Sequence, residues 1–346
     1  MTTLQHMLGL RWPILQAPMA GVQGSALAIA VSGAGGLGAL PCAMLGAEAM
    51  RSELAAIRAG TDRPFNVNFF CHRPPPPDPA REAAWREALA PYYAEFGLDP
   101  GSIAAAPGRA PFTAEAAELL AEFEPAVVSF HFGLPEPALL DRVRGWGARI
   151  LSSATTVDEG LWLQARGVDA VIAQGLEAGG HRGMFLSEDL STQVGTLALV
   201  PQLVSALRVP VIAAGGIADA HGVAAALALG AAAVQVGTAY LLCPEATTTP
   251  LHRAALQSEA ARHTALTRLF SGRPARGIVN RVMREIGPMS PLAPAFPLAT
   301  GALAPLRAAA EKQGRGDFSP LWSGQNATGC RPIGAAELTR GLAAAL

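Results

Sequence analysis

The residue best suited to acid–base chemistry is His181, in the segment QGLEAGGHRG at 174–183. An unperturbed imidazole has a pKa of about 6.5, so this side chain can exchange a proton near neutral pH. Glycines at 179, 180 and 183 leave few adjacent side chains to pack against the ring. We therefore predict that His181 contacts a substrate or acts as a catalytic base. The other histidines are interpreted first as structural residues: His6, His72, His131, His221, His252 and His263.

A metal site is not predicted. Glu177 and His181 are four residues apart, a spacing that could place both on one helix face, but the intervening Ala-Gly-Gly disfavours a helix. No second histidine or carboxylate completes a ligand set. The cysteines lack the Cys-x-x-Cys spacing of zinc sites and are predicted to be small buried side chains: Cys42, Cys71, Cys243 and Cys330.

Two glycine-containing segments, AAGGIAD (213–219) and QVGTA (235–239), follow predicted strands. Small residues there would let backbone N–H groups approach a phosphate closely, which predicts a phosphorylated cofactor or substrate. The alternative is that these glycines serve only the turns. A third segment, GAGGLG (33–38), matches a dinucleotide-binding pattern, but a helical stretch precedes it and a strand follows. Because that pattern requires the reverse order, we interpret it as a tight helix-to-strand turn.

Short apolar runs alternate with Ala/Leu-rich segments of helical spacing, which is typical of a parallel sheet. Eight runs are predicted as strands, the number that closes a barrel: 12–18, 36–40, 65–70, 126–132, 148–154, 169–175, 210–216 and 232–238. Helices are predicted at Glu48–Ala59, Ala114–Phe123, Val157–Arg166, Thr196–Leu207 and Ala220–Leu229. Thr113, Thr156 and Asp219 precede three of them as N-caps. Since barrel chemistry occurs at the carboxyl ends of the strands, Gln174 and His181 should lie at the mouth.

The predicted architecture is therefore an α/β protein with a (β/α)₈ TIM barrel at 1–242 and an added smaller lobe. A Pro-rich lid insertion at about 73–111, beginning with RPPPPDP, is expected to be irregular. Residues 243–325 are predicted to form a substrate or lid lobe over the mouth. Residues 326–346 should form a C-terminal segment that packs back on the barrel.

Composition narrows the possible partners. The formal net charge is −1 with 15% charged residues, which argues against a basic surface for nucleic acid or anionic membranes. Lys312 is the only lysine, so Schiff-base chemistry and a GK[ST] phosphate loop are nearly excluded. The uncharged stretches at 12–47 and 220–244 are interrupted by Gly, Pro or Gln and are predicted as buried strands and helices rather than membrane spans. With no secretory signal and scattered cysteines, we expect a cytoplasmic protein with a small-molecule partner.

Several segments together resemble a known family: QAPMAGV (16–22), AVSGAGGLGAL (30–40), FNVNFF (65–70), VVSFHFGLP (127–135), QGLEAGGHRG (174–183), VIAAGGIAD (211–219) and QVGTAYL (235–241). Their order and sequence are similar to the flavin-dependent nitronate monooxygenases, formerly 2-nitropropane dioxygenases, and to the related flavin-dependent enoyl-ACP reductases. FSGRPARG (270–277) and WSGQ (322–325) resemble the bacterial members. The resemblance covers almost the entire chain.

This resemblance implies a barrel that binds one FMN at its mouth and oxidises alkyl nitronates, and also neutral nitroalkanes, with dioxygen to a carbonyl compound and nitrite. His181 is implied as the base that removes the substrate α-proton, or as an imidazolium that binds the nitronate. The implied flavin contacts are Ala17, Pro18, Met19, Asn68, Gln174, Gly179, Gly180, Gly215, Gly216, Gln235, Val236, Gly237 and Thr238.

Alternatives remain open at this point. The same scaffold serves NAD(P)H-dependent reduction of quinones or enoyl thioesters, and fold resemblance does not separate these chemistries. A non-catalytic barrel that binds flavin or phosphate is a third possibility. A homodimer is compatible with each of them.

Overall fold

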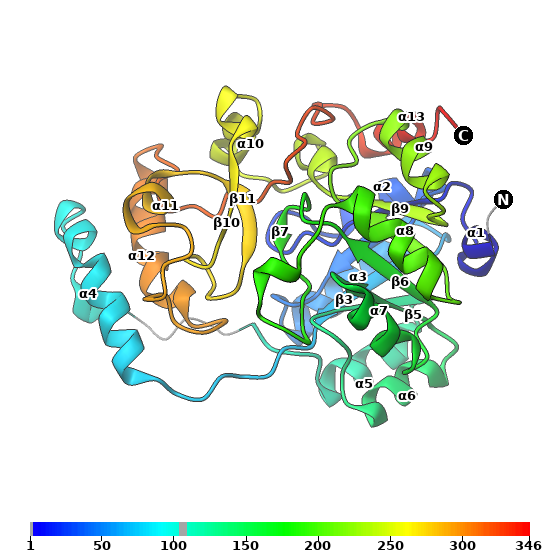
Figure 1. The fold of residues 1–346 in the computed structure, drawn as a ribbon, viewed down its shortest axis with the longest axis horizontal. Coiled ribbons are helices and arrows are strands. Elements are labelled where there is room, and N and C mark those ends of the chain that lie inside the picture. Colours follow the sequence, from blue (N-terminus) through cyan, green and yellow to red (C-terminus); the bar gives the residue numbers. More distant parts are fainter. Residues whose placement is uncertain (1–2, 104–108) are drawn as a thin grey trace.

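The computed structural model describes residues 3–103 and 109–346. Its larger part is a ring of parallel strands surrounded by helices, and a smaller lobe lies to one side (Figure 1). The barrel strands are β1 (Ile14–Gln16), β2 (Gly38–Pro41), β3 (Phe65–Phe70), β4 (Val127–His131), β5 (Arg149–Ala154), β6 (Ala170–Gln174), β8 (Val211–Ala214) and β9 (Ala233–Val236). All eight predicted strands are confirmed.

The barrel sheet runs in the order β1-β9-β8-β6-β5-β4-β3-β2. A parallel bridge between Leu15 and Leu37 joins its two outer strands, which completes the ring. The strands are buried along nearly their whole length because helices cover the outside and side chains fill the inside. The predicted (β/α)₈ fold is confirmed.

The helices around the barrel begin where local sequence favours them. Thr113, Thr156 and Asp219 each accept a hydrogen bond from a first-turn amide, so the three predicted N-caps are confirmed. The barrel helices are α1 (Thr3–Leu8), α2 (Ser25–Gly33), α3 (Ala47–Gly60), α5 (Ala114–Phe123), α6 (Pro137–Gly145), α7 (Val157–Gln164), α8 (Thr196–Ala206), α9 (Ala220–Ala228) and α13 (Ala335–Leu342). Sequence reasoning missed α1, α6 and α13, which are short.

The GAGGLG segment is the predicted turn between a helix and a strand. It joins α2 to β2, and Gly35 has a φ of +96°, a conformation that favours glycine. A Cβ on Gly38 would lie 2.1 Å from the carbonyl oxygen of Ala28. These glycines therefore let α2 pack closely on β2.

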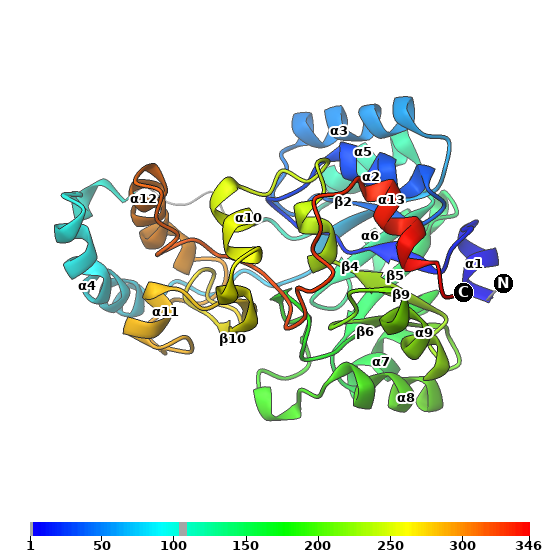
Figure 2. The same cartoon turned by 90° about the horizontal axis from the view of Figure 1, so that it is seen from above.

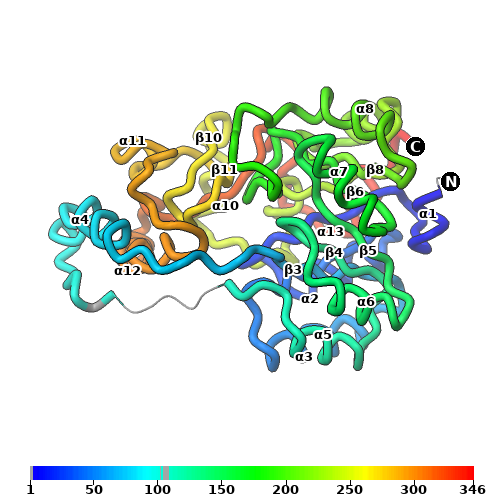
Figure 3. Tube along the Cα trace, turned by 60° about the horizontal axis from the view of Figure 1, so that its bottom comes forward, coloured from blue at the N-terminus to red at the C-terminus, as the bar shows by residue number. Residues whose placement is uncertain are grey.

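The smaller lobe contains α4 (Pro79–Glu95), α10 (Pro250–Leu256), α11 (Arg281–Ile286), α12 (Ala299–Lys312), β10 (Thr264–Thr267) and β11 (Ala275–Ile278). The expectation of an irregular 73–111 insertion is wrong, because α4 occupies much of it. Asp78 caps this helix and Pro79 stands in its first turn. Figure 3 shows the chain leaving β3 and running along the lobe to α4.

Helix α4 packs on α12 through a buried aromatic face (Figure 2). Trp85 Nε1 donates to the Ala299 carbonyl at 3.2 Å, and the Tyr93 hydroxyl donates to the Ala302 carbonyl at 2.6 Å. The two helices are more than 200 residues apart in the chain, which is why no local pattern predicted their pairing.

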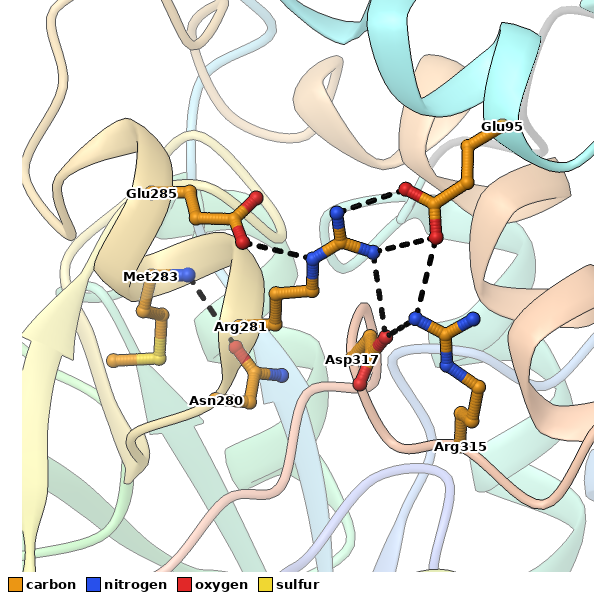
Figure 4. A network of polar contacts seen from close by, with 7 residues as sticks. All are labelled: Glu95, Asn280, Arg281, Met283, Glu285, Arg315 and Asp317. Atoms are coloured by element: carbon orange, nitrogen blue, oxygen red, sulfur yellow. Dashed lines mark hydrogen bonds and ion pairs between the residues drawn. The ribbon is translucent and has the colours of Figure 1, made fainter.

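An ionic network closes the end of α4 against the rest of the lobe (Figure 4). Arg281 contacts Glu95 at 2.8 Å and Glu285 at 2.9 Å. Arg315 contacts Glu95 at 3.3 Å and Asp317 at 2.5 Å. These side chains are partly exposed, so the network orients the segments more than it stabilises them.

The C-terminal segment returns to the barrel. Helix α13 lies against α2 and α9, and the hydroxyls of Tyr240 and Thr339 are 2.9 Å apart. Within the described ranges, every helix is too short or too polar to cross a membrane.

Candidate active site

A cavity of about 1360 Å³, including its open mouth, lies between the carboxyl ends of the barrel strands and the lobe. It is lined by every residue predicted for the site except Val236: His181, Ala17, Pro18, Met19, Asn68, Gln174, Gly179, Gly180, Gly215, Gly216, Gln235, Gly237 and Thr238. Val236 is 1% exposed and belongs to the barrel core, where its carbonyl accepts a hydrogen bond from the Ala17 amide. Because side chains alternate along β9, Gln235 faces the cavity and Val236 faces the surrounding helices.

The main chain of His181 is held on both sides. Gly180 and His181 form β7, which pairs antiparallel with β11 of the lobe. The His181 carbonyl also accepts hydrogen bonds from Gln174 Nε2 at 2.9 Å and His131 Nε2 at 3.2 Å. The segment that carries His181 is therefore held in place, and Gly180 is required there by its φ of +70°.

The imidazole of His181 has close neighbours from distant parts of the chain. Its Nε2 lies 2.9 Å from the Ser271 hydroxyl, which is 1% exposed. The flanking glycines suggested that few side chains would pack against the ring, but the ring is well packed. Aromatic rings surround it, with centroids 5.4 to 6.0 Å away: Phe296, Trp322, Phe70 and Phe132.

His181 is neutral in this environment. Burial lowers its pKa well below the ordinary histidine value, and the positive charge of Arg109 adds to that effect. No described residue forms a hydrogen bond with its Nδ1. This atom is also not one of the described polar atoms that are both buried and without a partner. A neutral ring with one nitrogen bonded to Ser271 and the other open to the cavity is suited to accept a proton.

His131 is a second buried histidine at the cavity wall. Its Nε2 donates to the His181 carbonyl, so its Nδ1 accepts from the Ser153 hydroxyl at 2.9 Å. Burial lowers the pKa of His131 to about 3. It acts structurally, as the sequence predicted, but it supports the segment that carries His181.

Glycines form the barrel-side rim of the cavity. Gly215 and Gly216 have φ angles of +119° and +73°, which favour glycine. The amides of Gly216, Gly237 and Thr238 donate to no other described residue. A Cβ on Gly237 would lie 3.2 Å from the Ala17 Cβ. Free N–H groups on backbone without side chains suit an anionic group such as phosphate.

The two predicted amide side chains differ. Asn68 Nδ2 donates to the hydroxyl and the carbonyl of Ser129, at 2.9 and 3.2 Å. Gln174 is engaged at both ends, because its Nε2 donates to His181 and its Oε1 accepts from the Gly183 amide at 2.7 Å. Each therefore keeps only part of its hydrogen-bonding capacity for a ligand.

Arg182, whose role the sequence left open, is enclosed in the protein. It is fully buried and donates to the carbonyls of Gly175 at 2.6 Å and Gln174 at 2.8 Å, and to Gln193 Oε1 at 3.1 and 3.0 Å. Burial lowers its pKa to about 10, at which it is still charged at neutral pH. It fixes the end of β6 and contacts neither the cavity nor bulk solvent.

Glu177 also has a structural role. Its carboxylate accepts from the amide and hydroxyl of Thr196, each at 2.8 Å. Among the described residues no cluster of histidine, cysteine, aspartate or glutamate could hold a metal ion.

Sequence reasoning missed several residues that line the cavity or contact His181. Ser271 and Trp322 lie in the FSGRPARG and WSGQ segments, whose resemblance to a family was visible but whose contact with His181 was not. Arg109 and His252 also line the cavity, and no local pattern marked them.

A closed parallel barrel with a cavity and a partly buried histidine at the carboxyl ends of its strands defines a TIM-barrel enzyme. The family model for nitronate monooxygenase matches residues 1–344, and the chain belongs to this family. It is thus an oxidoreductase.

Individual relatives agree with this assignment. The chain is 46% identical to a nitronate monooxygenase of Pseudomonas aeruginosa over 346 residues, with 97% of each chain covered. It is 45% identical to that of Paraburkholderia phytofirmans, covering 97% of this chain and 92% of the relative. Among solved structures, a nitroalkane oxidase from Streptomyces ansochromogenes has a TM-score of 0.89 at 40% identity, with 99% and 96% covered. FabK from Thermotoga maritima has a TM-score of 0.74 at 26% identity, with 99% and 94% covered.

Proposed function

We propose that this enzyme uses FMN to oxidise alkyl nitronates, and neutral nitroalkanes after deprotonation, with dioxygen, giving a carbonyl compound and nitrite. The observation that carries the proposal is the neutral, partly buried His181 in the wall of the cavity at the carboxyl ends of the strands. The extensive likeness to nitronate monooxygenases and to a nitroalkane oxidase supports it.

The residues at the rim fit an FMN. The unpaired amides of Gly216, Gly237 and Thr238 would hold the phosphate, and the absence of a side chain at Gly237 keeps the approach open beside Ala17. Asn68, with its Oδ1, would face the polar edge of the ring system.

When bound, FMN supplies the electron acceptor for nitronate oxidation. The protein's part is to position a base. With its proton on Nε2, His181 donates to the Ser271 hydroxyl, which leaves the Nδ1 lone pair to take the α-proton of a neutral nitroalkane. Low pKa keeps that lone pair available, so the base role is preferred to binding of a preformed nitronate by imidazolium.

The aromatic residues around His181 limit water near the reacting carbon. Phe70, Phe132 and Phe296 are each less than 9% exposed and face one another around the ring. In such a setting the proton transfer is between fixed neighbours rather than to solvent.

Reduction by NAD(P)H is the second candidate function, and the likeness to FabK favours it. That likeness is weaker than the one to the nitroalkane oxidase, in both TM-score and identity.

Anaerobic mixing of the flavin-loaded protein separates the two. We expect ethyl nitronate to bleach the flavin absorbance rapidly and NADH to leave it unchanged. Rapid bleaching by NADH with no response to ethyl nitronate would favour the reductase. If the purified protein retained no flavin and bound none when FMN was added, both enzyme proposals would fail.

A further inference from the structure

The permanent charge on the cavity wall is of one sign. Among the described lining residues, Arg109 alone carries a permanent charge, and no aspartate, glutamate or lysine lines the cavity. The groups that act electrostatically on His181 are Arg109, Arg273, His72 and His131, none of which is acidic. Because His72 and His131 are neutral, the permanent charges that act on the imidazole are the positive charges of Arg109 and Arg273.

Arg109 has no carboxylate partner. Its guanidinium lies over the Phe296 ring, 5.7 Å from the centroid, and NH1 donates a long 3.4 Å hydrogen bond to Thr300 Oγ1. No described acid forms an ion pair with it, and the neighbouring residues at 104–108 are AAAPG, which contain no acid in their sequence. By contrast, Arg281 in the same lobe contacts two glutamates.

This arrangement is costly unless something compensates it. Burial lowers the pKa of Arg109, and the nearby charge of Arg307 lowers it further. A partly desolvated cation in a cavity gains most from an anion that enters with the ligand.

The position of Arg109 indicates which anion that is. Arg109 and His181 share Phe296 as a neighbour: the guanidinium is 5.7 Å and the imidazole 5.4 Å from its ring centroid. The glycine rim that suits a phosphate is instead built from the ends of β8 and β9. Arg109 therefore belongs to the part of the cavity where the substrate meets the base.

We propose that Arg109 is the substrate-binding cation of this enzyme and donates to the two oxygens of the nitronate group. A planar guanidinium matches two oxygens on one atom, as it does in carboxylates. The anion's identity rests on the proposed function, whereas the anion site itself does not. Arg109 sets the preference for the charged nitronate over the neutral nitroalkane.

The kinetic test compares Arg109→Gln and Arg109→Lys with Arg307→Gln. Arg307 is a good control because it is close enough to act on Arg109, contacts Glu311 at 2.8 Å and does not line the cavity. We expect Arg109→Gln to raise KM for ethyl nitronate about tenfold or more, the loss of one charged hydrogen-bonding contact, with a smaller change in kcat. Arg109→Lys should be intermediate, and Arg307→Gln should stay within about twofold of the parent.

The substrate comparison guards against a merely structural effect. For neutral nitroethane, KM should change much less than for ethyl nitronate, because no full negative charge is bound. An equal rise for both substrates, or an unchanged KM for ethyl nitronate, would overturn the proposal. If Arg109→Gln does not fold, Arg109→Lys decides by the same comparison, with its melting temperature measured alongside.

A binding test needs no turnover. Nitrate is a planar, unreactive anion, and its titration into the flavin-loaded protein can be followed by the flavin absorbance and by calorimetry. We expect saturable binding to the parent and to Arg307→Gln, and at least tenfold weaker binding to Arg109→Gln. Equal nitrate binding by all three proteins would overturn the anion site. Loss of flavin from Arg109→Gln would do the same, because it would assign the arginine to the cofactor.

These measurements separate the two proposals. Arg109-dependent nitrate binding by a protein that does not oxidise nitronates would refute the proposed function and leave the anion site intact. If the protein oxidises nitronates but neither KM nor nitrate binding depends on Arg109, the proposed function stands and the anion site is refuted.

Discussion

The two walls of the cavity are built in different ways. The barrel wall consists of short segments that each follow a strand, such as Gly215–Gly216 and Gly237–Thr238, and it presents mainly backbone groups. The lobe wall presents side chains such as Arg109, His252 and Trp322, which come from separate parts of the chain. Under the proposed function, the barrel wall would bind the cofactor and the lobe wall would determine how the substrate meets it.

The largest effect should come from His181, where the two walls meet. We expect His181→Asn to lower kcat/KM for neutral nitroethane by about 100-fold or more, because a general base contributes on that scale. Flavin content should not change, since the contacts of Gln174 and His131 are to the main chain of residue 181. Oxygen consumption and flavin stoichiometry would measure both.

Ethyl nitronate provides the comparison within that variant. It has already lost its α-proton, so its oxidation should fall much less than that of nitroethane. Unchanged activity on nitroethane would show that the base is another group.

Arg182 tests the rigidity of the barrel wall. Arg182→Met removes the guanidinium that donates to the Gln174 carbonyl and the Gln193 side chain, and one of the two donors to the Gly175 carbonyl, so it should lower the free energy of unfolding by about 3 kcal/mol. Arg142→Met, which breaks one exposed ion pair with Glu118, should cost less than about 1 kcal/mol. Urea unfolding of both variants measures the difference, and similar losses would contradict the structural role of Arg182.

Acid should weaken both walls together. Burial lowers the pKa of His72 and His252 to about 4 and that of His131 to about 3, so each is neutral in the folded protein. The unfolded chain takes up protons once pH falls below about 6.5, so stability is full above that value and declines toward pH 4. Each histidine contributes at most about 1.4 kcal/mol per pH unit.

Urea unfolding at pH 7.5, 6.5 and 5.0 tests this. Carboxylates titrate mostly below that window, so a decline within it belongs to the histidines. A free energy of unfolding that stays constant down to pH 5 would show that these rings are protonated or exposed.

The smallest effect is expected far from the cavity, in the lobe. Tyr93→Phe removes the hydroxyl that bonds to the Ala302 carbonyl between α4 and α12, and should lower stability by about 1 kcal/mol. Flavin content should be unchanged and nitronate kinetics nearly so. A marked change in KM would instead show that the packing of α4 positions the substrate wall, which would sharpen the comparison.

The sequence predicted the barrel wall much better than the lobe wall. Strands, N-caps such as Thr113 and glycine turns such as 215–216 depend on neighbouring residues, so local pattern is sufficient for them. Helix α4 had helical composition, but the proline run before it suggested an irregular insertion, and its partner α12 is distant in the chain. The contacts of His181 with Ser271 and Trp322 depend on tertiary packing that no periodicity expresses.

The pairing of β7 with β11 has a mechanical consequence. Because the imidazole is carried by a two-residue strand that pairs with β11 of the lobe, any tilt of that lobe would displace His181 relative to the barrel rim. A chimera that exchanges the lobe to change the substrate range would therefore have to transfer β10, β11 and the segment carrying His181 together.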